Sequence, residues 1–139
     1  MKKDDLLIAA IFFLFPLFAS AQTTDYKVVF DLTSKDSLDH KSVIRWLTEV
    51  SKANPNAKME VVMYGQGYTM VTKERTVVGN AVTSLMANKN ISFKVCEVAM
   101  KNNNIDKSQL LPGIETVPDG IYEIIHKQRE GWGYIKAVH

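Results

Sequence analysis

Short runs of β-branched and other apolar residues alternate along the chain with longer segments of helical periodicity, and this alternation constrains the fold more than any other feature. The runs typical of strands are "YKVVFDLT" (26–33), "KMEVVMYG" (58–65), "ISFKVCEV" (91–98) and "WGYIKA" (132–137). Strands separated by helices are joined by right-handed crossovers into a mainly parallel sheet with helices on both faces. The sequence therefore predicts an α/β fold, a three-layer α/β/α sandwich with a mainly parallel sheet of four to five strands.

Capping residues and apolar stripes mark the longer helices between these strands. Asp36 or Ser37 can cap a first helix, which the "NPN" at 54–56 ends. A second amphipathic helix is expected over 77–86, because apolar residues recur there at helical spacing, and this helix has to tolerate Gly79.

The second half of the chain is expected to hold shorter helical elements. A helical turn is expected at 97–102, and Asp106 and Gln109 have the spacing of a capping box for another. Asp119 can cap a last helix, and Gly131 stands where a left-handed residue would end it.

The start of the chain has the pattern of an export signal. Residues 6–18 form an uncharged apolar run, and "ASA" at 19–21 has the small-x-small pattern that a signal peptidase reads. The run is shorter than the roughly 20 residues that a helix needs to span about 30 Å of hydrocarbon. We therefore expect residues 1–21 to be cleaved and residues 22–139 to form one domain, periplasmic or secreted, with no stable membrane insertion after processing. An uncleaved N-terminal anchor is the alternative.

Composition and charge exclude several classes of protein. The formal net charge is +2, and no basic run interleaves with aromatic residues, so a nucleic-acid-binding surface has no support. The single cysteine excludes an intramolecular disulfide. The three histidines, His40, His126 and His139, show no metal-ligand spacing, and we expect neither a metal nor a cofactor.

Two glycines, Gly65 and Gly67, follow the second expected strand in "YGQGY" (64–68). Glycine allows a tight turn or the close approach of a ligand to the backbone. A dinucleotide fingerprint requires a third glycine where Met70 stands, and a phosphate-binding loop requires a GK[ST] sequence, which is absent. A strand-end turn that lets the flanking tyrosines pack is the alternative to a ligand-binding loop.

Several chemically capable residues fall near the carboxyl ends of the expected strands, where α/β sheets bind their ligands. Cys96 lies at such an end, with Glu97 directly beside it, and Gly65 and Gly67 lie at another. His40, in the first turn of the first helix, could face the same rim and activate a nearby thiol, although an exposed helix histidine is the alternative. We expect Cys96 to be the catalytic residue and the other four to be candidate ligand-binding residues.

Four stretches of the chain, which cover about residues 26–137, occur together in a distinctive order: "YKVVFDLT", "VVMYGQG", "ISFKVCEVAMKNNNID" and "LLPGIETVPDGIYEIIHKQREGWGYIK". In this order they resemble the DsrE/DsrF-like family, in particular its exported, poorly characterised bacterial branch. The resemblance implies a five-stranded parallel α/β/α sheet and an oligomer, often a trimer or a hexamer. In the best-understood relatives a cysteine at this place carries persulfide sulfur in a relay. Transferred to this sequence, that residue is Cys96, and the resemblance implies a sulfur donor or acceptor protein as a partner.

The chemistry of the cysteine stays open at this point. A helical turn that begins at residue 97 places the thiol at a helix N-terminus, which favours the nucleophilic thiolate. Free cysteine is also among the most buried residue types and then behaves as a small apolar residue. Three functions follow: a sulfur carrier or sulfurtransferase-like protein that uses Cys96, a non-enzymatic small-ligand-binding domain, and an oligomeric interaction domain whose cysteine is structural.

Overall fold

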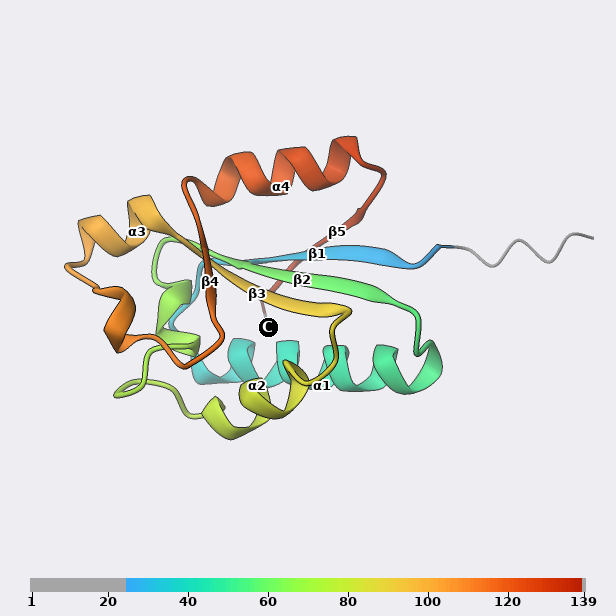
Figure 1. Cartoon of the computed structure of the whole chain (residues 1–139), viewed down its shortest axis with the longest axis horizontal. Coiled ribbons are helices and arrows are strands. Elements are labelled where there is room, and N and C mark those ends of the chain that lie inside the picture. The colour runs from blue at the N-terminus through green and yellow to red at the C-terminus, as the bar shows by residue number, and fades with distance from the viewer. Residues whose placement is uncertain (1–24, 139) are drawn as a thin grey trace, which may run out of the picture.

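A five-stranded parallel sheet lies between two layers of helices in the computed structural model, which describes residues 25–138 (Figure 1). The strand order is β4-β3-β2-β1-β5, and all neighbouring strands run parallel. The predicted α/β fold with a parallel sheet is confirmed, whereas the expected export signal at 1–21 lies outside the described residues. The strands are β1 (Lys27–Leu32), β2 (Lys58–Met63), β3 (Ile91–Cys96), β4 (Glu115–Val117) and β5 (Gly133–Lys136).

The helices cover the sheet unequally. Figure 1 shows α1 and α2 below the sheet and α4 above it, with α3 beyond the carboxyl ends of the strands. No helix within residues 25–138 is long and apolar enough to cross a membrane. The helices are α1 (Ser37–Ala53), α2 (Gly79–Leu85), α3 (Glu97–Asn102) and α4 (Gly120–Arg129), and short 3-10 turns form η1 (Gly67–Met70) and η2 (Lys107–Gln109).

Aspartate caps define the starts of the two longest helices. The Asp36 carboxylate accepts the Leu38 N–H at 2.8 Å, and the Asp119 carboxylate accepts the Ile121 N–H at 2.9 Å. Gly131, at φ 85°, follows the end of α4 in the left-handed region that favours glycine. These caps, and the capping box of η2, are as the sequence predicts.

The second helix is shorter than predicted. It was expected over 77–86, but α2 begins at Gly79, and Val77 is 61% exposed. The Thr76 hydroxyl accepts the Val78 N–H at 3.1 Å in a turn that delays the start of the helix. Strands β2 and β3 also end two residues before their expected ends, β3 because α3 begins directly at Glu97.

The two faces of the sheet differ in what they bury. Side chains alternate between the faces along each strand. On the α4 face, the buried apolar cluster is small: Val29, Val62 and Ile124, with the partly buried Tyr64 and Trp132 packed against them. Asp31 and Glu60 are buried on the same face. The face toward α1 and α2 holds the main core, which includes Phe30, Leu32, Val43, Leu47, Met59, Val61, Met63, Tyr68, Met70, Val82, Phe93 and Val95.

Candidate functional site

A cavity of about 210 Å³ opens at the carboxyl ends of β2 and β3. After β2 the chain turns toward the α1 and α2 layer, whereas after β3 it enters α3 on the other side (Figure 1). Neighbouring strands whose connections leave toward opposite faces create a crevice, and open α/β sheets bind ligands in such crevices. The cavity is lined by Tyr64, Gly65, Gln66, Cys96, Val98, Ala99, Asn102, Asn103, Asp119 and Ile121.

Cys96 lies where β3 becomes α3. It is the last residue of the strand and the N-cap of the helix, with extended backbone angles (φ −67°, ψ 121°). The residue is 4% exposed, and it is a free cysteine. Its side chain is therefore shielded from bulk solvent, and it borders the cavity at the crevice.

The start of α4 closes the cavity from above. Asp119 lines the cavity, but its carboxylate is engaged in capping the helix. Gly120 packs so closely that an added Cβ would lie 3.2 Å from the Cβ atoms of Cys96 and Tyr64 and from Val62 Cγ1. The absence of a side chain at Gly120 thus lets α4 sit directly on the cysteine.

Amide side chains form one wall of the cavity. Gln66 Nε2 donates to Asn103 Oδ1 at 3.0 Å and so joins the loop after β2 to the end of α3. Asn103 also donates to the Ala99 carbonyl at 2.7 Å. Behind this wall, Arg75 donates to the Tyr68 hydroxyl at 3.2 Å. The wall presents hydrogen-bonding groups without a formal charge.

A buried carboxylate fixes the tyrosine that lines the opposite wall. Asp31 Oδ2 accepts the hydroxyls of Tyr64 at 3.2 Å and Tyr134 at 2.5 Å, and Oδ1 accepts Lys136 Nζ at 3.0 Å. Burial, followed by the negative charge of Asp31, raises the pKa of Tyr64. The hydrogen bond to Asp31 raises the pKa of Tyr134 to about 12. Both phenols therefore remain protonated donors at neutral pH.

Of the candidate ligand-binding residues, Gly65 lines the cavity beside Cys96, and Gly67 does not. Gly65 adopts φ 56°, the left-handed conformation that the turn after β2 requires. Gly67 has a packing role, because a Cβ there would lie 2.1 Å from the Leu32 carbonyl oxygen.

His40 and Glu97 also lie outside the cavity lining. His40 is 3% exposed, and its Nε2 lies 2.9 Å from the Ser34 carbonyl oxygen, so the alternative of an exposed helix histidine is wrong. Glu97 is exposed and accepts the Thr116 hydroxyl at 2.7 Å, a hydrogen bond that lowers the pKa of this carboxyl. His40 thus stabilises the β1–α1 loop, and Glu97 joins α3 to β4.

Spacing in the sequence does not reveal the network of Asp31 with the two tyrosines. It also does not reveal Glu60 of β2 and Glu123 of α4, which the fold places 3.0 Å and 3.2 Å from the same ammonium group, that of Lys94. The available signal was an acidic residue in the middle of each of two otherwise apolar strands, because a buried charge requires a partner. The partners lie too far along the chain to be found by spacing.

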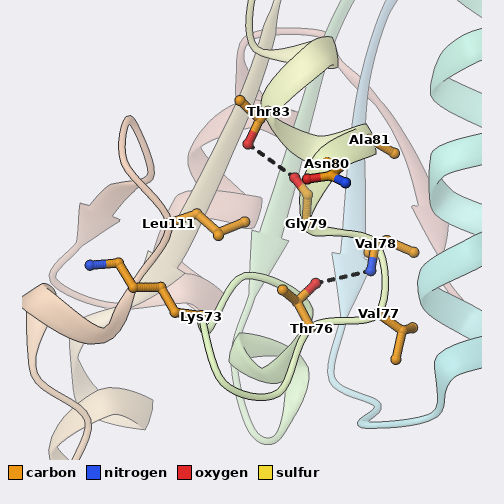
Figure 2. A pocket seen from close by; sticks show the side chains of 9 residues that line it. All are labelled: Lys73, Thr76, Val77, Val78, Gly79, Asn80, Ala81, Thr83 and Leu111. Atoms are coloured by element: carbon orange, nitrogen blue, oxygen red, sulfur yellow. Dashed lines mark hydrogen bonds between the residues drawn. The ribbon is translucent and has the colours of Figure 1, made fainter.

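A larger cavity, of about 540 Å³, lies beside the start of α2, and Figure 2 shows its lining. Its polar groups are used locally: Thr83 Oγ1 donates to the Gly79 carbonyl at 3.0 Å, and Lys73 Nζ donates to the Ser108 carbonyl at 2.7 Å. The candidate catalytic and ligand-binding residues from the sequence, Cys96, Gly65, Gly67, His40 and Glu97, do not line it. Within residues 25–138 there is also no group of histidine, cysteine and acidic residues that could hold a metal ion.

Solved structures show the same fold. The protein of unknown function MTH1491 from Methanobacterium thermoautotrophicum matches with 26% identity and a TM-score of 0.75, over 81% of this chain and 99% of that chain. The ychN protein from E. coli matches with 12% identity and a TM-score of 0.61, over 80% of this chain and 98% of that one. A search of the curated proteins finds no match.

A family model extends this likeness to the sequence. The model of the DsrE/DsrF-like family matches residues 9–137, a range that begins inside the expected export signal. At the level of the family, this match implies a function related to sulfur relay. The match covers nearly the whole chain, and together with the fold it establishes that the protein belongs to the DsrE/DsrF-like family.

Proposed function

We propose that this protein is a sulfur carrier that holds a persulfide on Cys96. The observation that carries the proposal is the place of the thiol, at the end of β3 on the cavity between β2 and β3. The Cys96 thiolate attacks the outer sulfur of a donor persulfide, R–S–SH. A sulfur–sulfur bond forms on Cys96, the donor's sulfur–sulfur bond breaks, and R–S⁻ leaves. A thiolate of an acceptor removes the same sulfur by the reverse type of step.

The lining of the cavity supports an uncharged donor group. Gln66, Asn102 and Asn103 present amides, and Val98 and Ile121 add apolar surface. No lysine or arginine is among the lining residues, and the Asp119 carboxylate lies there. An inorganic sulfur oxoanion would therefore lack a counter-charge for the group that donates sulfur, whereas a persulfide of a thiol compound or of a protein cysteine donates sulfur from its neutral R–S–SH form.

The burial of Cys96 favours a second candidate function. A residue that is 4% exposed has limited contact with reagents in solution. A non-enzymatic domain that binds a small ligand in the cavity, with a structural cysteine in its wall, uses the same geometry without any reaction. The two functions differ in whether the folded protein transfers sulfur.

Persulfide transfer to the folded protein distinguishes them. The protein is incubated with glutathione persulfide, and intact-mass spectrometry is followed by peptide mapping. We expect a gain of one sulfur atom on Cys96, reversed by excess free thiol and absent in Cys96→Ser. If only denatured protein gains sulfur and Cys96→Ser keeps its fold and its ligand affinity, the cysteine is structural and the binding function is the correct one.

Export from the cytoplasm is part of the same proposal. The apolar run at 6–18 and the "ASA" at 19–21 support cleavage after Ala21. N-terminal sequencing of protein from the periplasmic or secreted fraction should read from Gln22. An intact N-terminus in the membrane fraction would show an uncleaved anchor instead.

The last part of the proposal is that the protein assembles into a homo-oligomer, either a trimer or a hexamer. It is supported by family membership and by large apolar side chains that are exposed on α4 and β5, namely Ile121, Tyr122, Ile125, Tyr134 and Ile135. Sedimentation equilibrium at micromolar concentration should give a multiple of the chain mass, and Tyr122→Glu should lower that mass. A monomer across this range would contradict the proposal.

A further inference from the structure

Four hydrogen bonds run in series from an exposed arginine to α3, along one wall of the cysteine cavity. Arg75 Nη1 donates to the Tyr68 hydroxyl at 3.2 Å, and that hydroxyl donates to Gln66 Oε1 at 3.4 Å. Gln66 Nε2 donates to Asn103 Oδ1 at 3.0 Å, and Asn103 Nδ2 donates to the Ala99 carbonyl at 2.7 Å. Gln66, Ala99 and Asn103 line the cavity, whereas Arg75 does not. The chain therefore links a residue outside the cavity to three residues that form it.

The acceptor and the donor at the two ends of this chain fix the direction of every bond in it. A guanidinium group only donates hydrogen bonds, and a carbonyl oxygen only accepts them. The Ala99 carbonyl turns the nitrogen of Asn103 toward itself, which leaves Asn103 Oδ1 for the nitrogen of Gln66. Gln66 Oε1 then faces the Tyr68 hydroxyl, whose oxygen accepts from Arg75 and whose single proton is left for Gln66. Each amide thus has one orientation that satisfies the whole chain.

The bond between Tyr68 and Gln66 is the weakest of the four. Its length of 3.4 Å exceeds the value of about 2.7–2.8 Å that is usual for a hydroxyl donor. Gln66 is exposed, so water competes for its oxygen unless the hydroxyl proton is directed at it. The bond from Arg75 occupies the other side of the hydroxyl oxygen and so directs the proton toward Gln66. The strength of this weakest bond therefore depends on Arg75.

The turn after η1 places Arg75 against Tyr68. The Thr72 side chain donates to the Tyr68 carbonyl at 2.8 Å, and the Thr72 carbonyl accepts the Arg75 N–H at 3.0 Å. The guanidinium carbon lies 5.8 Å from the centre of the Tyr68 ring. Tyr68 is 2% exposed and belongs to the main core, where close packing holds the ring in place. Its hydroxyl is therefore a fixed point from which the amide wall is held.

We propose that Arg75 is a positioning residue for the cysteine cavity: through the Tyr68 hydroxyl it holds Gln66, and through Gln66 it holds the amide wall that binds the sulfur donor. The identity of that donor as a persulfide rests on the proposed function. Because Arg75 lies outside the cavity lining, it affects how tightly the donor binds and not how fast Cys96 attacks it. Binding and the reaction at sulfur are separable by experiment.

The first measurement is the uptake of sulfur by Cys96 from glutathione persulfide, followed by mass spectrometry over a range of donor concentrations. Arg75→Met keeps an unbranched apolar stem and removes every hydrogen-bond donor. We expect the half-saturating donor concentration to rise roughly threefold to tenfold, as for the loss of one hydrogen bond, with the rate at saturation unchanged. Arg75→Lys keeps a donor and should recover part of the loss. Arg45→Met, at an exposed arginine of α1, is the matched control and should follow the unaltered protein.

Tyr68→Phe tests whether Arg75 acts through the hydroxyl. It keeps the ring, so the main core stays packed, and it should raise the half-saturating donor concentration as Arg75→Met does. In a chain of bonds in series a second break costs nothing more, so the double variant should resemble each single variant. Effects that multiply in the double variant would show that the two residues act independently and would overturn the inference. A fall in the rate at saturation, with no change in the half-saturating concentration, would overturn it as well.

A readout without any donor separates this inference from the proposed function. The side-chain amide signals of Gln66 and Asn103 are followed by nuclear magnetic resonance in the free protein. They should shift in Arg75→Met and in Tyr68→Phe and stay in place in Arg45→Met. If they shift but the unaltered protein takes up no sulfur, the proposed function fails and the positioning of the wall stands. If they stay in place in every variant, the positioning role is wrong, whatever the uptake of sulfur.

Discussion

The two faces of the sheet use different chemistry to hold their helices. On the α1 and α2 face, strand residues such as Phe93 are fully buried among other apolar side chains. On the α4 face, the buried apolar cluster has three members, Val62, Val29 and Ile124, and Asp31 and Glu60 are buried on the same face. The first face is stabilised by burial of apolar surface, and the second depends on hydrogen bonds and charge.

This difference separates stability from reactivity. Apolar packing is insensitive to pH, whereas hydrogen-bonded carboxyl groups change with it. Cys96 faces the α4 side, with Tyr64 and the start of α4 against it. The thiol therefore lies on the polar side of the sheet, and the main apolar core lies on the other side.

The largest expected loss of stability comes from truncating a side chain in the main core, on the α1 and α2 face. Phe93→Ala should lower the free energy of unfolding by about 3–5 kcal/mol, because it leaves a cavity in the main core. Ile124→Ala, the matched change on the α4 face, should cost about 2 kcal/mol, because its apolar cluster is small. Urea denaturation measures both values. Equal losses would contradict the contrast between the faces.

An intermediate effect is expected from Asp31→Asn, which should cost about 2 kcal/mol because it removes a buried charge from three donors. The pKa of Tyr134 should return from about 12 toward 10.0, as ultraviolet absorbance during alkaline titration would detect. The raised pKa stabilises the fold fully below about pH 10, and that stabilisation is lost as the pH rises through about 12. Asp31→Asn should show a smaller loss in this window, because burial and Tyr64 also raise the pKa of Tyr134. An unchanged tyrosine titration would contradict the network.

The smallest effect on stability, with the sharpest effect on the site, is expected from Gly120→Ala. The added Cβ at 3.2 Å from three neighbours should cost about 1 kcal/mol and raise the alkylation rate of Cys96 at neutral pH. Gly133→Ala is the matched control, since its nearest atom is the Lys27 carbonyl oxygen at 3.5 Å. If both variants leave the cysteine equally protected, α4 does not control access to it.

The apolar face was largely predictable from the sequence, because its signals are local. Short runs of β-branched and other apolar residues indicated the strands, and Asp36 and Asp119 indicated where the long helices begin. The expectation for the start of α2 was wrong, because periodicity alone does not detect the turn that Thr76 stabilises, and α2 ends one residue earlier than expected. The place of Cys96 at the end of β3 was predicted correctly, since strand ends follow from the same local signals.

The polar face was not predictable, because its contacts join residues far apart in the chain. The Asp31–Tyr134 bond spans 103 positions, and the Lys94–Glu123 bond spans 29. His40 could be interpreted as a ligand or as an exposed residue, and only the path of the β1–α1 loop shows that it binds the Ser34 carbonyl. Spacing identifies neighbours along a helix or strand, and it does not identify neighbours across a sheet.

The strand order also has a consequence for how the chain is made. β1 is synthesised first, and its pairing partner on one side, β5, comes from the last segment of the fold. A growing chain can pair β1 with β2 early, but the other edge of β1 stays unpaired until residues 133–136 have left the ribosome. Asp31 acquires Tyr134 and Lys136 in that same final event. Closure of the sheet and completion of the network behind the cysteine cavity are therefore one step, and a chain truncated before residue 133 lacks both.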